Sequence, residues 1–237
     1  TVVFFGGVAR SPGDSSPSPQ RADAVAARLV NGFAAGDTAG YVRGLERQAQ
    51  DGPRSAQTLA LLGLGYLQLV RETGDPSFYP KAEDSLRQAL QLEPRDLHAT
   101  TGLAAVAASR HRFDEARALA TKAVTLSPSA AAPYGILGDA LVELGRYEEA
   151  FAAFDRMSML KPSATAYARV SYARELLGDT QGAEEAMELA VEAAGPASEP
   201  AAWAIVNLGN LQLEQGRLER AADLFRHALA RLPGYSP

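Results

Sequence analysis

The 237-residue sequence contains no cysteine, and it has only three histidines and three lysines. The absence of cysteine excludes disulfide bonds, thiolate metal sites and cysteine nucleophiles. His98, His111 and His227 lie far apart, and none belongs to a closely spaced pair of potential ligands, so we interpret them as solvated or packed side chains. We therefore expect no metal site, no cofactor and no catalytic centre.

Basic residues are scarce relative to acidic ones, because 23 Lys and Arg stand against 28 Asp and Glu, for a net charge of -5. A surface that binds nucleic acid needs a basic stripe to neutralise phosphates, so nucleic acid is not an expected partner. Aromatic residues make up only 7% of the chain, and β-branched runs are rare, whereas Ala and Leu are abundant. This composition favours helices, because Ala and Leu lose little conformational freedom on entering one.

The sequence repeats itself at an interval of 34 residues, from Pro94 to Pro128 (128 − 94) and from Pro128 to Pro162 (162 − 128). These prolines end the phrases ALQLEP, AVTLSP and MSMLKP. Small side chains at fixed spacing let two antiparallel helices approach closely, and neighbouring units then bury the apolar stripe that one unit cannot bury alone. We expect such close contact at Gly138 and Ala150. The recurring small residues are Ala82, Ala116, Ala150, Ala183 and Ala221, and again Ala89, Ala123, Ala190 and Ala228.

These residues resemble the tetratricopeptide repeat family over roughly residues 22 to 233. The resemblance implies an all-α fold, a right-handed α-solenoid of about six antiparallel helix pairs that forms a superhelix. It also implies that the first helix of each pair makes the concave inner wall, where such proteins bind protein segments. Met157 departs from the family pattern, because it stands at a site that is usually small. The residues that fit the pattern best are Tyr134, Leu137, Gly138, Leu141, Gly145, Tyr147, Ala150, Phe154 and Pro162.

The period divides the chain into a segment at 1–20, apolar at first and then rich in Pro and Ser, and a solenoid at 21–237. The expected units span approximately 22–55, 56–96, 97–130, 131–163, 164–201 and 202–237. The first unit is degenerate, as a terminal repeat can be, because it packs on one side only. Seven extra residues before Pro94 predict a first helix that extends toward Thr73, followed by a loop held by Pro76 and Pro80.

The repeat register predicts which side chains face the inner wall and could bind a peptide. Small and apolar residues come first along the chain, and polar, acidic and aromatic ones follow. Asn is useful on such a wall, because its amide both donates to and accepts from a peptide backbone. Inner lysines, which the chaperone-tail receptors of the family use to grip a carboxylate, are absent. The predicted wall comprises Leu61, Leu64, Leu67, Ala105, Asp139, Glu143, Arg169, Tyr172, Glu175, Trp203, Asn207, Asn210 and Glu214.

The sequence begins with TVVFF, an apolar segment of strong β-propensity, and continues with SPGDSSPSPQ, which has the composition of an extended linker. Three interpretations stay open. The segment is the end of a membrane anchor or export signal, it is non-native sequence, or it docks on the apolar inner wall of its own or a neighbouring molecule. The first interpretation favours a bacterial protein that is exported or membrane-anchored over a cytoplasmic one. The apolar residues concerned are Val2, Val3, Phe4 and Phe5.

Together these patterns predict a protein without catalytic activity, a scaffold that binds a peptide or protein segment in its concave groove. Two alternatives come from other classes of function. The solenoid could be a structural scaffold that assembles copies of itself, or it could be a regulatory or accessory domain of a larger enzyme system.

Overall fold

The structure is a computed structural model that describes residues 37–195 and 198–232. Every regular element in these ranges is an α-helix, which confirms the predicted all-α class. The segment 1–20, with Val2, Val3, Phe4 and Phe5, and the expected first helix of the unit 22–55 lie outside the described residues. The eleven helices of the described ranges are α2 (Thr38–Asp51), α3 (Ala56–Thr73), α4 (Phe78–Leu92), α5 (Leu97–Ser109), α6 (Phe113–Leu126), α7 (Ala131–Glu143), α8 (Tyr147–Leu160), α9 (Ala164–Leu176), α10 (Thr180–Ala194), α11 (Ser198–Glu214) and α12 (Leu218–Arg231).

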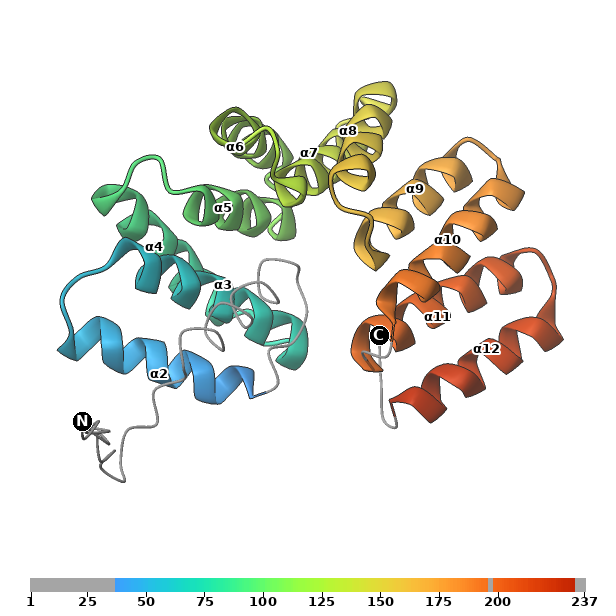
Figure 1. Ribbon diagram of the computed structural model, residues 1–237, viewed down its shortest axis with the longest axis horizontal. Coiled ribbons are helices and arrows are strands. Elements are labelled where there is room, and N and C mark those ends of the chain that lie inside the picture. Colours follow the sequence, from blue (N-terminus) through green and yellow to red (C-terminus); the bar gives the residue numbers. More distant parts are fainter. Residues whose placement is uncertain (1–36, 196–197, 233–237) are drawn as a thin grey trace, which may run out of the picture.

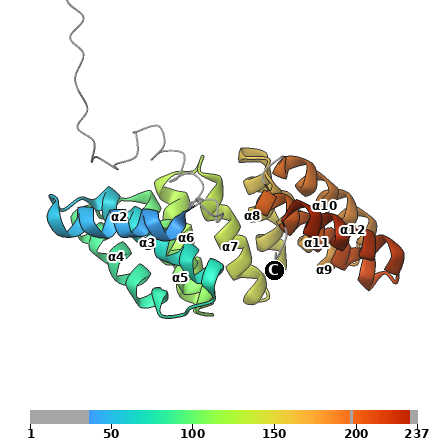
Figure 2. The same cartoon turned by 90° about the horizontal axis from the view of Figure 1, so that it is seen from below.

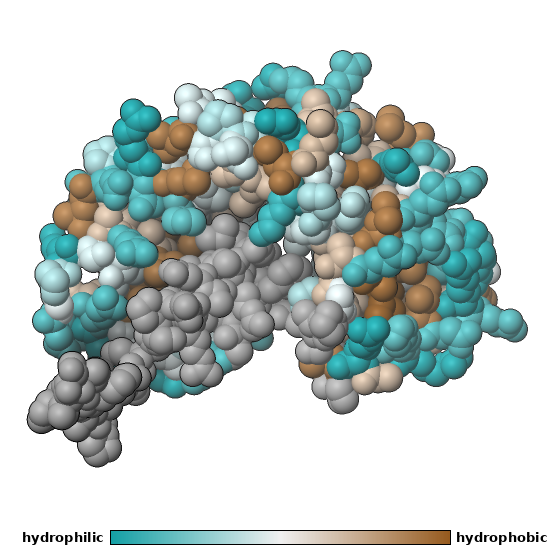
Figure 3. All heavy atoms as spheres, in the orientation of Figure 1, coloured by the Kyte–Doolittle hydropathy of each residue, from teal (hydrophilic) through white to brown (hydrophobic). Residues whose placement is uncertain are grey.

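The helices pack in consecutive pairs, α3 with α4, α5 with α6, α7 with α8, α9 with α10 and α11 with α12, and α2 packs on α3. The pairs follow one another along an arch, in which α3 and α5 lie on the inner side and α4 and α6 on the outer side (Figure 1). Seen from below, the helices of the C-terminal half lie obliquely to those of the N-terminal half, so the row twists (Figure 2). On the face shown in Figure 3, hydrophilic side chains predominate along the outer rim of the arch, and hydrophobic ones gather between the helices. The predicted helical solenoid is thus confirmed.

The repeated prolines end the second helix of each pair, as the sequence predicts. The residues before them, Glu93, Ser127 and Lys161, all have extended backbone, with ψ close to 90°. A proline disfavours the helical conformation of the residue that precedes it, so the helix stops there. The next helix then starts at an N-cap. The Asp96 carboxylate accepts a hydrogen bond from the Ala99 backbone N–H at 2.6 Å, and the Ser163 hydroxyl accepts one from the Ala166 N–H.

The two helices of a pair are joined by a tight turn that requires a left-handed residue. Gly145, Gly178 and Gly216 have φ of 72°, 76° and 74°, and the next backbone N–H bonds back to the helix end, as from Arg146 N to the Leu141 carbonyl at 2.8 Å. His111, with φ of 57°, occupies the same position in the pair α5–α6. A side chain in this conformation costs roughly 1–2 kcal/mol, which glycine avoids.

The predicted close contact at Gly138 and Ala150 is confirmed between α7 and α8. Ala150 is fully buried, and a Cβ on Gly138 would lie 2.3 Å from Cε1 of Phe154. Phe154, itself only 1% exposed, packs with Leu141 and Ala150 in the core of this pair. The missing side chain of Gly138 therefore makes the room that the Phe154 ring fills.

The region after α3 differs in part from expectation. The helix extends to Thr73, as predicted, and ends at Gly74. Pro80, however, lies in the first turn of α4 and not in the loop. The first turn tolerates proline because its backbone N–H groups have no acceptor within the helix. Farther on, α11 begins at Ser198, earlier than the expected unit boundary at 202.

The first helices of successive pairs also pack on one another, α3 on α5, α5 on α7 and α9 on α11, but α7 and α9 make no comparable backbone contact. Met157 lies on α8 at this junction, at the position that fully buried alanines such as Ala123 and Ala190 hold in other units. Its larger side chain is accommodated against Gly135, where a Cβ would lie only 2.8 Å from the Met157 sulfur. At this junction, side chains and not close backbone packing join α7 to α9.

Candidate functional site

Polar and aromatic side chains of the predicted wall lie on α7, α9 and α11, and we call this set the inner strip. Interactions between helices link Arg169 with Asp139, and Tyr172 with Glu143. Glu143, Tyr172, Asn210 and Glu214 are exposed, and the other members are half-buried. The inner strip comprises Asp139 and Glu143 on α7, Arg169, Tyr172 and Glu175 on α9, and Trp203, Asn207, Asn210 and Glu214 on α11.

Arg169 and Asp139 form a bidentate ion pair across the α7–α9 junction. The Arg169 Nε and Nη2 atoms donate to the two Asp139 carboxylate oxygens at 2.9 Å and 2.7 Å, and Nη1 donates to the Thr165 carbonyl at 3.1 Å. Burial opposes the charged guanidinium, but the Asp139 carboxylate outweighs it and raises the pKa of Arg169. Since three of its donors are engaged, Arg169 bridges the two helices and holds the Asp139 charge in place.

Three carboxylates of the inner strip, those of Glu143, Glu175 and Glu214, have no ion pair with any residue in the described ranges. Burial, and then the charge of Glu214, raise the pKa of the Glu175 carboxyl. Burial, and then the charges of Glu143 and Glu175, raise the pKa of the Tyr172 hydroxyl. The inner strip therefore concentrates negative charge around an aromatic ring that is 44% exposed.

The α11 residues of the inner strip are partly engaged in packing. The Trp203 ring lies against the core cluster that contains Ala168, Met187 and Leu208. The Asn207 amide donates to the Trp203 carbonyl at 2.8 Å. Asn210, one turn further on, is exposed. Among these three residues, Asn210 thus offers the freest amide to a ligand.

The N-terminal part of the predicted wall differs from expectation. Leu64 and Leu67 are only 6% and 3% exposed and belong to the hydrophobic core, while Leu61 and Ala105 are half-buried against the same cluster. The helix α3 that carries these leucines packs against α2, α4 and α5, so its apolar positions are covered. In the structure Leu64 and Leu67 are core residues and do not form an exposed apolar wall.

Two exposed side chains next to the inner strip were not predicted from the sequence. Leu176 follows Tyr172 by one helical turn and is 43% exposed. Tyr147, at the start of α8, is 48% exposed, stacks on Phe151, and contributes to the raised pKa of Tyr172. The spacing of four residues from Tyr172 could have indicated Leu176. The position of Tyr147 beside the inner strip could not be predicted in this way, because the repeat pattern assigns Tyr147 to the second helix of its pair.

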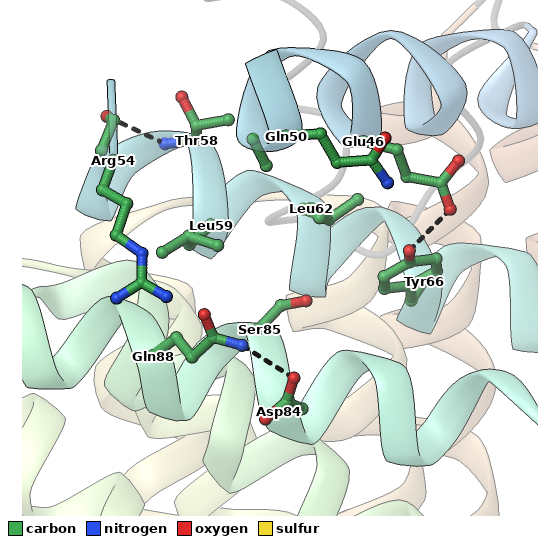
Figure 4. A pocket seen from close by; sticks show the side chains of 12 residues that line it. Glu46, Gln50, Arg54, Thr58, Leu59, Leu62, Tyr66, Asp84, Ser85 and Gln88 are labelled. Atoms are coloured by element: carbon green, nitrogen blue, oxygen red, sulfur yellow. Dashed lines mark hydrogen bonds between the residues drawn. The ribbon is translucent and has the colours of Figure 1, made fainter. Parts of the chain in front are cut away.

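Two cavities of the described residues lie elsewhere, in furrows between second helices of neighbouring pairs. One of about 270 Å³ lies between α2 and α4 over α3. Figure 4 shows Glu46 and Gln50 on its α2 side, and Asp84, Ser85 and Gln88 on its α4 side. The Tyr66 hydroxyl donates to Glu46 at 2.7 Å, and the Gln88 amide donates to Asp84 at 2.8 Å. Another, of about 430 Å³, lies between α6 and α8 over α7.

Two kinds of site are not found in the described part of the chain. Its residues contain no group of three or more His, Cys, Asp or Glu side chains that could hold a metal ion. None of its helices is long and apolar enough to cross a membrane.

Comparison with known families explains the repeat. Models of the tetratricopeptide repeat match residues 67–131, 107–171 and 163–233, which together form one uninterrupted stretch. The chain belongs to the tetratricopeptide repeat family. Proteins of this family are in general scaffolds for protein interactions, and this general role is supported for the chain.

Solved structures of low sequence identity share the fold. A thermophilic TPR protein of Thermus thermophilus is 23% identical, with a TM-score of 0.66 over 76% of this chain and 93% of that one. The APC/C hetero-tetramer Cut9-Hcn1 is 18% identical, with a TM-score of 0.72 over 92% of this chain, which spans only 40% of that one. The pilF protein of Pseudomonas aeruginosa is 16% identical, with a TM-score of 0.58 over 91% of this chain and 94% of that one. No curated protein sequence matches the chain.

Proposed function

We propose that the inner strip binds a protein segment that carries lysine or arginine side chains. The observation that supports this most directly is the set of three carboxylates, Glu143, Glu175 and Glu214, that lack an ion pair in the described structure. Burial, and then the charge of Glu214, raise the pKa of Glu175, and a cation placed between these two carboxylates would relieve their repulsion.

The neighbouring side chains suit the same kind of ligand. Tyr172 presents an aromatic ring, and a cation over such a ring gains about 0.5–1 kcal/mol at an exposed site. Leu176 adds apolar area one turn further along α9. Asn210 has an exposed amide that can donate to and accept from the backbone of an extended segment. A basic segment with an adjacent apolar residue thus fits the chemistry of the inner strip.

The proposal is tested with a short dye-labelled peptide of alternating lysine and alanine, whose binding to the full chain is followed by fluorescence anisotropy. Trp203, the single tryptophan, gives a second, local signal. We expect binding that weakens with salt. The double variant Glu143→Gln and Glu175→Gln should weaken it about tenfold, or ~1.4 kcal/mol.

Two controls separate this from general attraction to an acidic protein. Replacing the lysines of the peptide with glutamate should abolish binding. Glu148→Gln, which removes an exposed charge on α8 that is not part of the inner strip, should leave the affinity unchanged. Equal weakening by Glu148→Gln and by the inner-strip substitutions would reject the proposal.

Self-association is a second candidate, favoured by apolar side chains at the C-terminal end of the described solenoid. Leu218 and Leu229 on α12 are 63% and 52% exposed. Light scattering over a concentration series tests this role. A mass that stays that of the monomer would exclude it, whereas growth that Leu218→Ser and Leu229→Ser suppress would support it.

A further inference from the structure

The furrow between α6 and α8, which we call the arginine furrow, has arginines on opposite walls, and no carboxylate links the two among the described residues. Arg117 lies on its α6 wall and Arg146 on its α8 wall, at the start of that helix. Leu137 and Leu141 of α7 form its apolar floor, and the volume of this open groove is about 430 Å³. No ion pair joins α6 to α8 across this furrow among the described residues.

The lining of the arginine furrow also includes Glu149, which accepts hydrogen bonds from Arg146 at 2.7 Å. One period earlier, Arg112 pairs in the same way with Glu115 and still holds a second carboxylate, that of Glu83.

In the preceding furrow, between α4 and α6, an ion pair bridges the two helices at the positions that correspond to Arg117 and Arg146. The position one period before Arg117 (117 − 34) is Glu83, and the position one period before Arg146 (146 − 34) is Arg112. Arg112 donates to Glu83 at 3.0 Å, and Arg87 donates to it at 2.7 Å. Burial raises the pKa of the Glu83 carboxyl, but hydrogen bonds from Arg87 and Arg112 outweigh this and lower it. A carboxylate at this place is therefore strongly held.

In the furrow between α10 and α12, a carboxylate at the same position also bridges the two helices. Glu184 comes directly after a small alanine, as Glu83 and Arg117 do. It accepts a hydrogen bond from Arg217 and forms an ion pair with Arg220 at 3.1 Å. The furrow between α8 and α10 carries apolar Phe151 at this position. The arginine furrow is thus the one furrow of this register in the described helices where arginine replaces the bridging carboxylate.

The arginine furrow also has room that the preceding furrow lacks. Thr121 stands where the preceding furrow has Arg87 (121 − 34), and Ala153 stands where it has Leu119 (153 − 34). The Arg117 Nε atom is buried and has no hydrogen-bond partner. Among the described residues, its guanidinium has only Asp114, at 3.8 Å, as an ionic neighbour. An unsatisfied buried donor of this kind costs free energy until an acceptor reaches it.

We propose that the arginine furrow binds a glutamate or aspartate side chain of a partner protein. The carboxylate lies between Arg117 and Arg146, in the place that Glu83 and Glu184 occupy in the bridged furrows. An apolar residue next to it in the partner covers Leu137 and Leu141. This surface lies among second helices and shares no residue with the inner strip, so it does not depend on the function proposed above.

The test uses the full chain and a short dye-labelled peptide of alternating leucine and glutamate, with the leucine–glutamine peptide as its matched control. Binding is followed by anisotropy, and the arginine Nε–H signals are followed by NMR. We expect the glutamine peptide to bind at least about tenfold more weakly, with shifts of the Arg117 and Arg146 signals. Equal binding of the two peptides would overturn the proposal.

Variants locate the site. Arg117→Glu reproduces the residue of the bridged furrows, so it should keep the fold, pair with Arg146 and abolish binding of the glutamate peptide. Arg117→Gln should weaken binding about tenfold. Arg156→Gln removes an exposed arginine of α8 outside the arginine furrow and should have no effect. An equal loss in Arg156→Gln, or peptide binding by Arg117→Glu, would contradict the proposed site.

Two further measurements test for a simple anion site and for the independence of the two surfaces. Inorganic phosphate is titrated alone, and binding of phosphate without binding of the glutamate peptide would replace the proposal with a simple anion site. Glu175→Gln, on the inner strip, should leave binding of the glutamate peptide unchanged. Loss of binding in Glu175→Gln would contradict the separation of the two surfaces.

Discussion

Gly138→Ala tests whether the packing of α7 on α8 depends on the absence of one methyl group. The new Cβ would lie 2.3 Å and 2.5 Å from the Cε1 and Cδ1 atoms of the Phe154 ring. Carbon atoms pack at about 3.5–4.0 Å, so the ring must move by roughly 1 Å. Phe154 is only 1% exposed, and Leu141 and Ala150 pack against it, so the surrounding core resists this movement.

The magnitude follows from two opposing effects. Overpacking of a well-packed core costs typically about 1–3 kcal/mol. Alanine is better than glycine in a helix interior by about 1 kcal/mol, which offsets part of this cost. We expect Gly138→Ala to lower the free energy of unfolding by about 1 kcal/mol. In a Phe154→Leu background the obstruction is smaller, so the same substitution should cost less or become stabilising.

Gly209 supplies a matched control in the last pair. A Cβ there would lie 2.5 Å from Cε1 of Phe225, but Phe225 is half-buried on α12, the last described helix, and has more freedom to turn outward. Gly209→Ala should therefore be neutral or stabilising by up to about 1 kcal/mol. Urea unfolding followed by circular dichroism measures both variants. An equal gain of stability in Gly138→Ala and Gly209→Ala would refute the reasoning.

Three further predictions concern single positions, each measured as stability by the same unfolding assay. His111→Gly should raise stability by up to about 1 kcal/mol, because it relieves the left-handed backbone, whereas His111→Ala should lower it, because only the edge-on ring contact with Phe113 is lost. Ala150→Leu should lower stability by about 1–3 kcal/mol through overpacking of a fully buried site. The raised pKa of Glu175 means that the folded state favours the protonated carboxyl. The stability that this protonated carboxyl contributes is fully present below the unfolded pKa of about 4.3, and it is lost as the pH rises through the folded pKa. Glu175→Gln should therefore match the native chain at low pH and exceed its stability at neutral pH, and a constant difference across this range would contradict the assignment.

The fold could be predicted from the sequence because its determinants are local and repeated. The prolines fix the ends of the second helices through the backbone of the residue before them, such as Glu93 and Lys161. Glycines such as Gly145 fix the turns within pairs, because the turn needs a left-handed residue. His111-Arg112 stands one period before Gly145-Arg146 (145 − 34), and this alignment would also have indicated that His111 adopts the left-handed conformation.

The candidate site could be predicted only in part. A helical register gives the direction of a side chain, but it does not give the number of helices that cover it. The register predicts Leu64 and Leu67 on the open wall of α3, yet neighbouring helices bury them. The ion pair of Arg169 and Asp139 depends on the distance between two helices 30 residues apart in sequence. That distance is set by tertiary packing, which no local pattern records.

The pair α7–α8 lies at the meeting point of the two proposed surfaces, and helical geometry explains how one helix serves both. Residues two apart on an α-helix point about 200° away from each other, to nearly opposite sides. On α7, Leu137 and Leu141 form the floor of the arginine furrow, while Asp139 and Glu143, two residues further on, belong to the inner strip. The buried Phe154 ring packs behind Leu141. Because a packed core separates the two surfaces, a basic segment on the inner strip would not displace an acidic one from the furrow. The two proposals thus describe a scaffold that can hold two different segments at once, and the charge of each segment decides which side it takes.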